Sequence, residues 1–108
     1  LVRSRGLGDV YKRQVYMQYK SYKTLQINKE FGNLISALRN KKNPDKSRLQ
    51  FCYEYDLDAG NLSRIENGLI DPKLSMLWRL SEAIDMPLSE IFKILEDNLG
   101  KDFYVIDK

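Results

Sequence analysis

Apolar residues recur at helical spacing along most of this chain, and short polar segments separate the apolar stripes. The segment from Asn40 to Pro44 ends the first stripe, because proline disfavours helix at the residue before it. A weak strand signal is confined to residues 103–106. We therefore expect an all-α domain with three amphipathic stripes: Leu25, Ile27, Phe31, Leu34, Ile35 and Leu38; Leu74, Leu77, Trp78, Leu80, Ala83 and Ile84; Leu88, Ile91, Phe92, Leu95 and Leu99.

Two shorter helices are predicted between the first and second stripes from their capping signals. Ser47 and Gln50 fit a capping box, in which each side chain satisfies a backbone donor of the other residue. Asp58 is a good N-cap for the next helix, and Asn67-Gly68 is a strong stop because both residue types tolerate left-handed backbone. With Pro87 starting the last helix, the pattern predicts five helices near residues 24–40, 47–55, 58–67, 74–84 and 88–98.

The spacing of the second and third predicted helices carries the functional signal. This region resembles the Cro/CI-type helix-turn-helix family, also called the xenobiotic-response-element family, from about residue 31 to residue 92. The resemblance implies a compact five-helix, lambda-repressor-like DNA-binding domain. We place it at residues 25–98, between an extension at 15–24 and a tail at 99–108. The matching residues are Ser47, Phe51, Cys52, Asp56, Leu57, Asp58, Asp71, Pro72, Leu77, Leu80, Ala83, Ile84 and, as the most specific run, residues 62–68 (Leu-Ser-Arg-Ile-Glu-Asn-Gly).

Two positions depart from the usual residues of that family. Cys52 stands where alanine is common, and a buried thiol also behaves as a small hydrophobic group. A reactive role for Cys52 is disfavoured because the chain has no histidine to activate it. Asp56 stands where glycine is common in the turn, and aspartate tolerates left-handed backbone better than most residues. Both departures are compatible with the motif.

The predicted core is the test of this interpretation, since exposure of Leu62 or Ile65 would overturn it. We expect one cluster drawn from all five helices. Its members are Phe31, Leu34, Ile35, Leu38, Phe51, Cys52, Leu57, Leu62, Ile65, Leu77, Leu80, Ile84, Leu88 and Phe92.

The resemblance makes residues 58–67 the recognition helix, whose N-terminal end enters the major groove. Arg64 is the best candidate base reader, because its guanidinium matches guanine O6 and N7, and Asn61 suits adenine. Ala59 suits contact with a thymine methyl group, and Gly60 permits a close approach. The expected base contacts are Ala59, Gly60, Asn61, Ser63 and Arg64.

Three further residues match positions that hold the DNA backbone in the family: Arg48, Asn67 and Lys73. Glu66 is acidic within a DNA-binding helix, so we expect it to face away from DNA and to orient a neighbour such as Arg48. The lysines before the second helix are expected to add screening charge; they are Lys41, Lys42 and Lys46.

The first fourteen residues are expected to be foreign to the natural protein. One back-translation of residues 9–14 (Asp-Val-Tyr-Lys-Arg-Gln) resembles the transposase end sequence used in sequencing-library adapters, and residues 4–8 fit the adapter bases before it. We therefore treat residues 1–14 as an adapter-derived segment without packed contacts, and Met17 as a plausible natural start. The alternative is a natural basic arm.

Setting that segment aside changes the charge argument. The chain has 18 Lys and Arg against 15 Asp and Glu, a net charge of +3, and residues 1–14 alone account for +3. Residues 15–64 carry nine basic and five acidic groups, whereas residues 65–108 carry five basic and nine acidic groups. The distribution therefore favours a basic half that faces phosphates and an acidic half that faces away.

Composition also narrows the chemistry. With one cysteine and no histidine, the chain cannot form an intrachain disulfide, a zinc site with the usual ligands or a histidine-based catalytic site. Apolar runs are shorter than the roughly 20 residues that span a bilayer. The sequence shows no phosphate-binding glycine loop, paired-carboxylate motif or nucleophile–base set. We expect a cytoplasmic, non-enzymatic protein without a metal or cofactor.

These observations favour sequence-specific binding of double-stranded DNA by a transcriptional regulator, more specifically a repressor. One module of this kind covers about 600–1,000 Å², so we expect a homodimer with recognition helices about 34–36 Å apart. The last helix and residues 103–106 are the candidate dimer interface. The alternative function is an antitoxin-type protein-interaction module of a toxin–antitoxin pair, although residues 99–108 are short for a neutralising segment.

Overall fold

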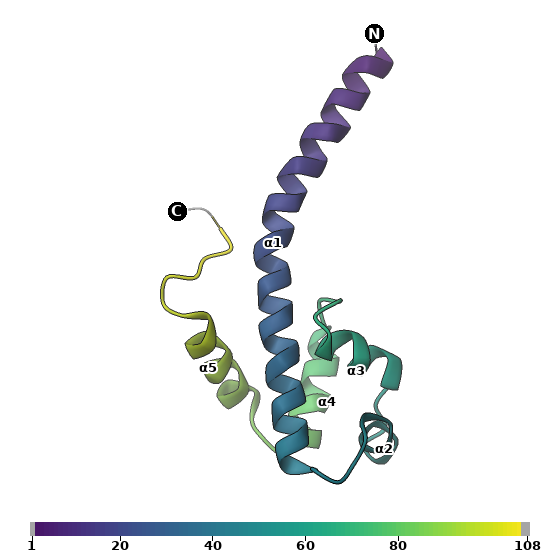
Figure 1. The fold of residues 1–108 in the computed structure, drawn as a ribbon, viewed down its shortest axis with the longest axis vertical. Helices are drawn as coiled ribbons and strands as arrows, with labels where there is room; N and C mark the ends of the chain where they lie inside the picture. The colour runs from purple at the N-terminus through teal and green to yellow at the C-terminus, as the bar shows by residue number, and fades with distance from the viewer. Residues whose placement is uncertain (1, 107–108) are drawn as a thin grey trace.

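The computed structural model describes the backbone of residues 2–106 and the side chains of residues 22–106. It contains five helices: α1 (Val2–Lys42), α2 (Arg48–Glu54), α3 (Ala59–Glu66), α4 (Leu74–Ile84) and α5 (Leu88–Leu99). The described backbone contains no strand, so the expected all-α fold is confirmed and the strand signal at residues 103–106 is wrong. In Figure 1, α1 runs through the middle of the molecule, with α5 on one side and α2 and α3 on the other.

Helix α1 is much longer than the predicted 24–40. It begins at Val2, and its N-terminal half projects beyond the other helices (Figure 1). Residues 2–23 include the weak helix formers Gly6 and Gly8 but contain no proline, so every residue keeps the backbone N–H that a helix needs. The expected lack of packing by residues 1–14 lies outside the side chains that the structure describes.

The core forms where the second half of α1 packs against α3, α4 and α5. Phe51, Leu62 and Ile65 are almost completely buried, which supports the predicted packing of α2 and α3. The full set of buried apolar residues is Phe31, Leu34, Ile35, Phe51, Cys52, Leu57, Leu62, Ile65, Leu80, Ala83, Ile84, Ile91 and Leu95.

The core prediction needs correction mainly in α5. Ile91 and Leu95 are buried, whereas Phe92 is partly buried and Leu88 lies outside the cluster. Leu88 is the first residue of α5, so its turn lies at the edge of the contact with α1. Leu38 and Leu77 are likewise only partly buried, at the margin of the core.

Three residues of the predicted stripes are exposed instead of buried. Trp78 is 59% exposed, Leu74 is 67% exposed and Leu25 is 51% exposed. In α4 the buried apolar residues are Leu80, Ala83 and Ile84, so the inward face lies in the second half of the helix. The apolar periodicity predicted the helix correctly, but the predicted apolar face was wider than the face that is buried.

The C-terminal tail lies beside α1 and is held by Lys23, whose Nζ donates a hydrogen bond to the carbonyl oxygen of Tyr104 (2.5 Å). Between α1, α5 and this tail is an open, largely apolar hollow of about 950 Å³. Its apolar side chains include Ile27, Leu95, Leu99, Phe103, Val105 and Ile106. Within the described part of the chain, we find no helix that is both long and apolar enough to cross a membrane.

Candidate nucleic-acid interface

The starts of α2 and α3 are fixed by the side chains that the sequence indicates. Ser47 Oγ accepts a hydrogen bond from the Gln50 backbone N–H (3.1 Å), and Gln50 Oε1 accepts one from the Ser47 N–H (2.9 Å). This is the predicted capping box. Asp58 Oδ1 accepts a hydrogen bond from the Asn61 N–H (2.8 Å), so Asp58 is the N-cap of α3 as predicted.

The turn between these helices is tight and partly strained. Asp56 adopts left-handed backbone with φ of 54°, which is the conformation expected where the family usually has glycine. The next residue, Leu57, turns back into the core and donates its N–H to the carbonyl oxygen of Cys52 (2.8 Å). The Asp56 carbonyl oxygen in turn accepts a hydrogen bond from Arg79 of α4 (3.3 Å). The turn is therefore attached to both α2 and α4.

Cys52 lies inside α2 and is buried, so it serves as a packing residue as expected. Burial raises the pKa of the Cys52 thiol, and the nearby Glu66 carboxylate adds to this effect. A raised pKa keeps the thiol neutral and unreactive at pH 7.

A glycine that sequence reasoning did not single out brings α3 close to α1. A Cβ atom at Gly32 would lie 2.2 Å from the carbonyl oxygen of Ile65 and 2.8 Å from that of Glu66. These contacts are with backbone, so no side chain fits there. The available signal was a glycine inside an otherwise regular amphipathic helix, which often marks a close packing contact.

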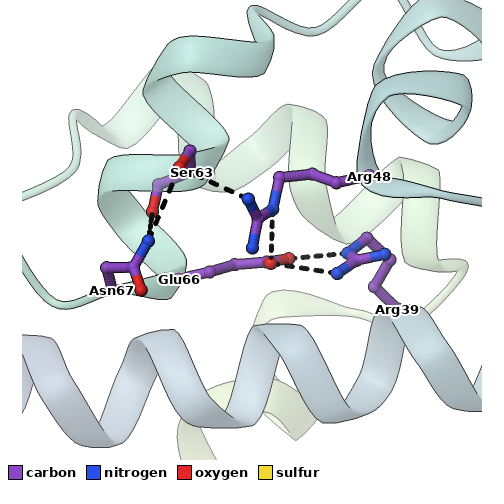
Figure 2. A network of polar contacts seen from close by, with 5 residues as sticks. All are labelled: Arg39, Arg48, Ser63, Glu66 and Asn67. Atoms are coloured by element: carbon purple, nitrogen blue, oxygen red, sulfur yellow. Dashed lines mark hydrogen bonds and ion pairs between the residues drawn. The ribbon is translucent and has the colours of Figure 1, made fainter.

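Figure 2 shows a network that joins α1, α2 and α3. The Glu66 carboxylate accepts hydrogen bonds from Arg39 Nε (2.7 Å) and Nη2 (3.0 Å) on α1, and from Arg48 Nε (2.9 Å) on α2. The Arg39 and Glu66 side chains are 7% and 2% exposed, and Arg48 is 38% exposed. The expected pairing of Glu66 with Arg48 is confirmed. Glu66 is, in addition, a buried anchor that fixes the positions of three helices.

Arg39 is the functional residue that the sequence analysis missed. It follows Phe31 and Ile35 at four-residue spacing, so it occupies the inward face of α1. A single basic residue in that apolar row, together with an acidic residue beside Ile65 on α3, was the signal for a buried ion pair.

The end of α3 is tied to the same network (Figure 2). Arg48 Nη1 donates to Ser63 Oγ (3.3 Å), and Asn67 Nδ2 donates to the Ser63 carbonyl oxygen (2.8 Å). Asn67 is the C-cap of α3, and Gly68 follows in left-handed backbone with φ of 70°. The stop predicted at Asn67-Gly68 is therefore confirmed.

The predicted base-contacting residues differ in their exposure. Gly60, Asn61 and Arg64 are exposed on the same face of α3, and Arg64 Nη1 donates to Asn61 Oδ1 (3.0 Å). Ala59 is partly buried against the core, and Ser63 is half-buried beneath Arg48. The structure thus brings three of the five predicted residues together at the exposed N-terminal half of α3.

The lysines expected near the DNA backbone differ in whether they have partners within the chain. Lys73 is exposed at the N-terminus of α4. Lys42 donates to the carbonyl oxygen of Ala83 (2.9 Å), and Lys46 pairs with Glu54. Both lysines thus have partners within the chain, and their expected screening role stays a prediction.

Two capped helices, joined by a left-handed turn and locked to α1 by buried contacts, define a helix-turn-helix protein. We find no group of three or more candidate metal ligands among the described residues. No family model matches the chain. The chain is 38% identical to Control protein C.MunI from a Mycoplasma species over 66 residues, which is 61% of this chain and 88% of that protein. It therefore belongs to the family of that control protein and is a regulator of the helix-turn-helix kind.

Proposed function

We propose that the chain is a Cro/CI-type transcriptional regulator, a repressor, that binds double-stranded DNA sequence-specifically through α3. The observation that carries the proposal is the exposed face of Gly60, Asn61 and Arg64, on a helix whose position is fixed by caps and by the buried Glu66 network. Such rigid support is what a base-reading helix needs, because hydrogen bonds to bases depend on orientation.

Arg64 is the leading base reader in this proposal, with Gly60 and Asn61 beside it. Ala59 and Ser63 stay at the margin of the contact because their side chains are partly buried. Lys73 and Asn67 flank the C-terminal side of α3 and are exposed, so they suit phosphate contact. Arg48 is engaged by Glu66 and Ser63, and its remaining donors are available to a phosphate.

We further propose that the chain binds as a homodimer through α5 and residues 103–106. In support, α5 contacts α1 and α4 but not α3, so this surface stays available when α3 occupies a groove. The apolar hollow beside the tail offers side chains that a single chain leaves uncovered. The similarity of the chain to a control protein agrees with a regulatory role.

Selection of bound sequences from random duplex DNA, at stated salt, tests the function. We expect one enriched motif with two related half-sites about 10 base pairs apart. Enrichment of no motif, with affinity that depends only on salt, would contradict the proposal.

A further inference from the structure

The exposed face of α3 contains an arginine held in one position by its neighbours. Side chains of a helix lean toward its N-terminus, so Arg64 covers the turn formed by residues 60 and 61. Arg64 Nη1 donates to Asn61 Oδ1 at 3.0 Å. The long side chain is thus directed back toward the end of α3 that enters a groove in the proposed function.

Gly60 lies between this guanidinium and the capping carboxylate of Asp58. A Cβ atom at position 60 would stand 3.5 Å from Arg64 Nη1 and 3.7 Å from Nη2, which are ordinary van der Waals contacts, and 3.2 Å from Asp58 Oδ1, which is a tight contact. The Arg64 side chain therefore packs over residue 60 on its way back to Asn61.

The same contact gives Asn61 a role besides reading a base. Oδ1 accepts from Arg64, and the Asn61 backbone N–H is used by the Asp58 cap, so the asparagine is fixed at both its side chain and its backbone. The amide oxygen has two lone pairs, so the contact with Arg64 is compatible with direct reading of adenine as well. The two roles are separated by the variants described below.

We propose, on the basis of the proposed function, that Asn61 is a positioning residue that determines base preference through Arg64. The guanidinium keeps further donors beyond the one given to Asn61, and the base they suit is guanine, through O6 and N7. Recognition then depends on a pair of residues that reads one base pair.

Asn61→Asp and Asn61→Ala separate this role from direct reading of adenine. Aspartate keeps an oxygen that accepts from Arg64 but loses the amide donor that adenine requires. We expect Asn61→Asp to keep the wild-type base preference within about 2-fold while lowering affinity for all sequences, because it adds negative charge near phosphates. Asn33 is exposed on α1, so Asn33→Asp is the control. It measures how much an added negative charge on another helix lowers the affinity for DNA.

Base preference is measured by competition binding on the selected site and its single-base variants. We expect Arg64→Ala to lower preference at one base pair by about 10-fold. Asn61→Ala should lower it at the same base pair by about 3-fold, and should add nothing when Arg64 is already alanine. Circular-dichroism melting confirms that each variant is folded.

Additive effects of Asn61→Ala and Arg64→Ala, or loss of preference for adenine at a different base pair in Asn61→Asp, would overturn this proposal. If the wild-type chain selects no motif at all, the proposed function fails, and this proposal with it.

Discussion

The carboxylate of Glu66 is shared by arginines from two different helices. Removing a charge from a water-excluded pair is costly because the partner stays buried without compensation. The two arginines differ in this respect. Arg39 is buried and would be left unpaired by the loss of Glu66, whereas Arg48 is partly exposed and reaches solvent.

We expect Glu66→Ala to lower the free energy of unfolding by about 3–5 kcal/mol, because it leaves Arg39 buried without a partner. Arg39→Ala should cost less, on the order of 2 kcal/mol, since Glu66 keeps its bond to Arg48. Arg48→Ala is the matched control and should cost at most about 1 kcal/mol. Urea denaturation followed by circular dichroism measures all three. A larger loss for Arg39→Ala than for Glu66→Ala would contradict this account.

The phosphate contacts proposed for Lys73 and Asn67 are tested by separate substitutions. Lys73→Ala should weaken binding to all sequences about equally and reduce the dependence of log affinity on log salt by about one unit, because one phosphate contact is lost. Asn67→Ala should lower affinity without changing that dependence, since asparagine is neutral. Fluorescence anisotropy titrations at several salt concentrations measure both. A Lys73→Ala effect confined to one DNA sequence would argue against a phosphate contact.

At the scale of elements, the connections of the helix-turn-helix were the most predictable part. Ser47, Asp58 and Gly68 act within a few residues, through backbone hydrogen bonds and φ preferences, so their roles follow from local sequence. The pairing of Arg39 with Glu66 was not predictable in this way, because 27 residues separate them and only the packing of α1 on α3 brings them together.

Helix faces were predicted less well than helix positions. Leu88 and Ile91 are equally apolar in the sequence, and only the placement of α5 against α1 decides which of them is buried. Trp78 fits the stripe of α4 but is 59% exposed, because α1 and α5 pack on the face formed by Leu80, Ala83 and Ile84. Gly60, Asn61 and Arg64 are the exposed members of the five predicted base-contacting residues, and the contact between Arg64 and Asn61 was not predictable because it depends on side-chain conformation.

The turn between α2 and α3 gives a prediction at this scale. Asp56→Gly should preserve or raise stability, by at most about 1 kcal/mol, because glycine adopts left-handed backbone without strain. Asp56→Ala should lower stability by about 1 kcal/mol, because its Cβ stays and the polar side chain is lost. Thermal melts of the two variants measure this difference. Equal melting temperatures would show that the turn stores no strain.

At the scale of the whole molecule, α1 separates two surfaces. The exposed face of α3 lies on one side, and α5 with the tail lies on the other (Figure 1). The net charge of +4 in residues 15–64 and −4 in residues 65–108 does not divide along α1, because residues 65–108 include α4, which lies on the same side as α3. The separation of α3 from α5 itself suits one surface for DNA and one for a second subunit in the proposed function.

We expect Ile106→Glu to weaken the proposed dimer at least about 10-fold, because Ile106 is 74% exposed beside the apolar hollow and a charge there is costly to bury. Leu74→Glu, on the exposed side of α4, is the matched control and should leave the dimer intact. Sedimentation velocity at micromolar concentration measures both. Dissociation by Leu74→Glu alone would place the interface on α4.

The buried Glu66 network has a further consequence for how this module can change. Arg39 and Glu66 set the geometry of α3 from inside the protein, while Gly60, Asn61 and Arg64 lie outside it. Exchanging the outer three residues therefore leaves the supporting geometry intact. In the proposed function, new DNA targets would then become accessible through substitutions that cost little stability, and regulator and operator could diverge together in small steps.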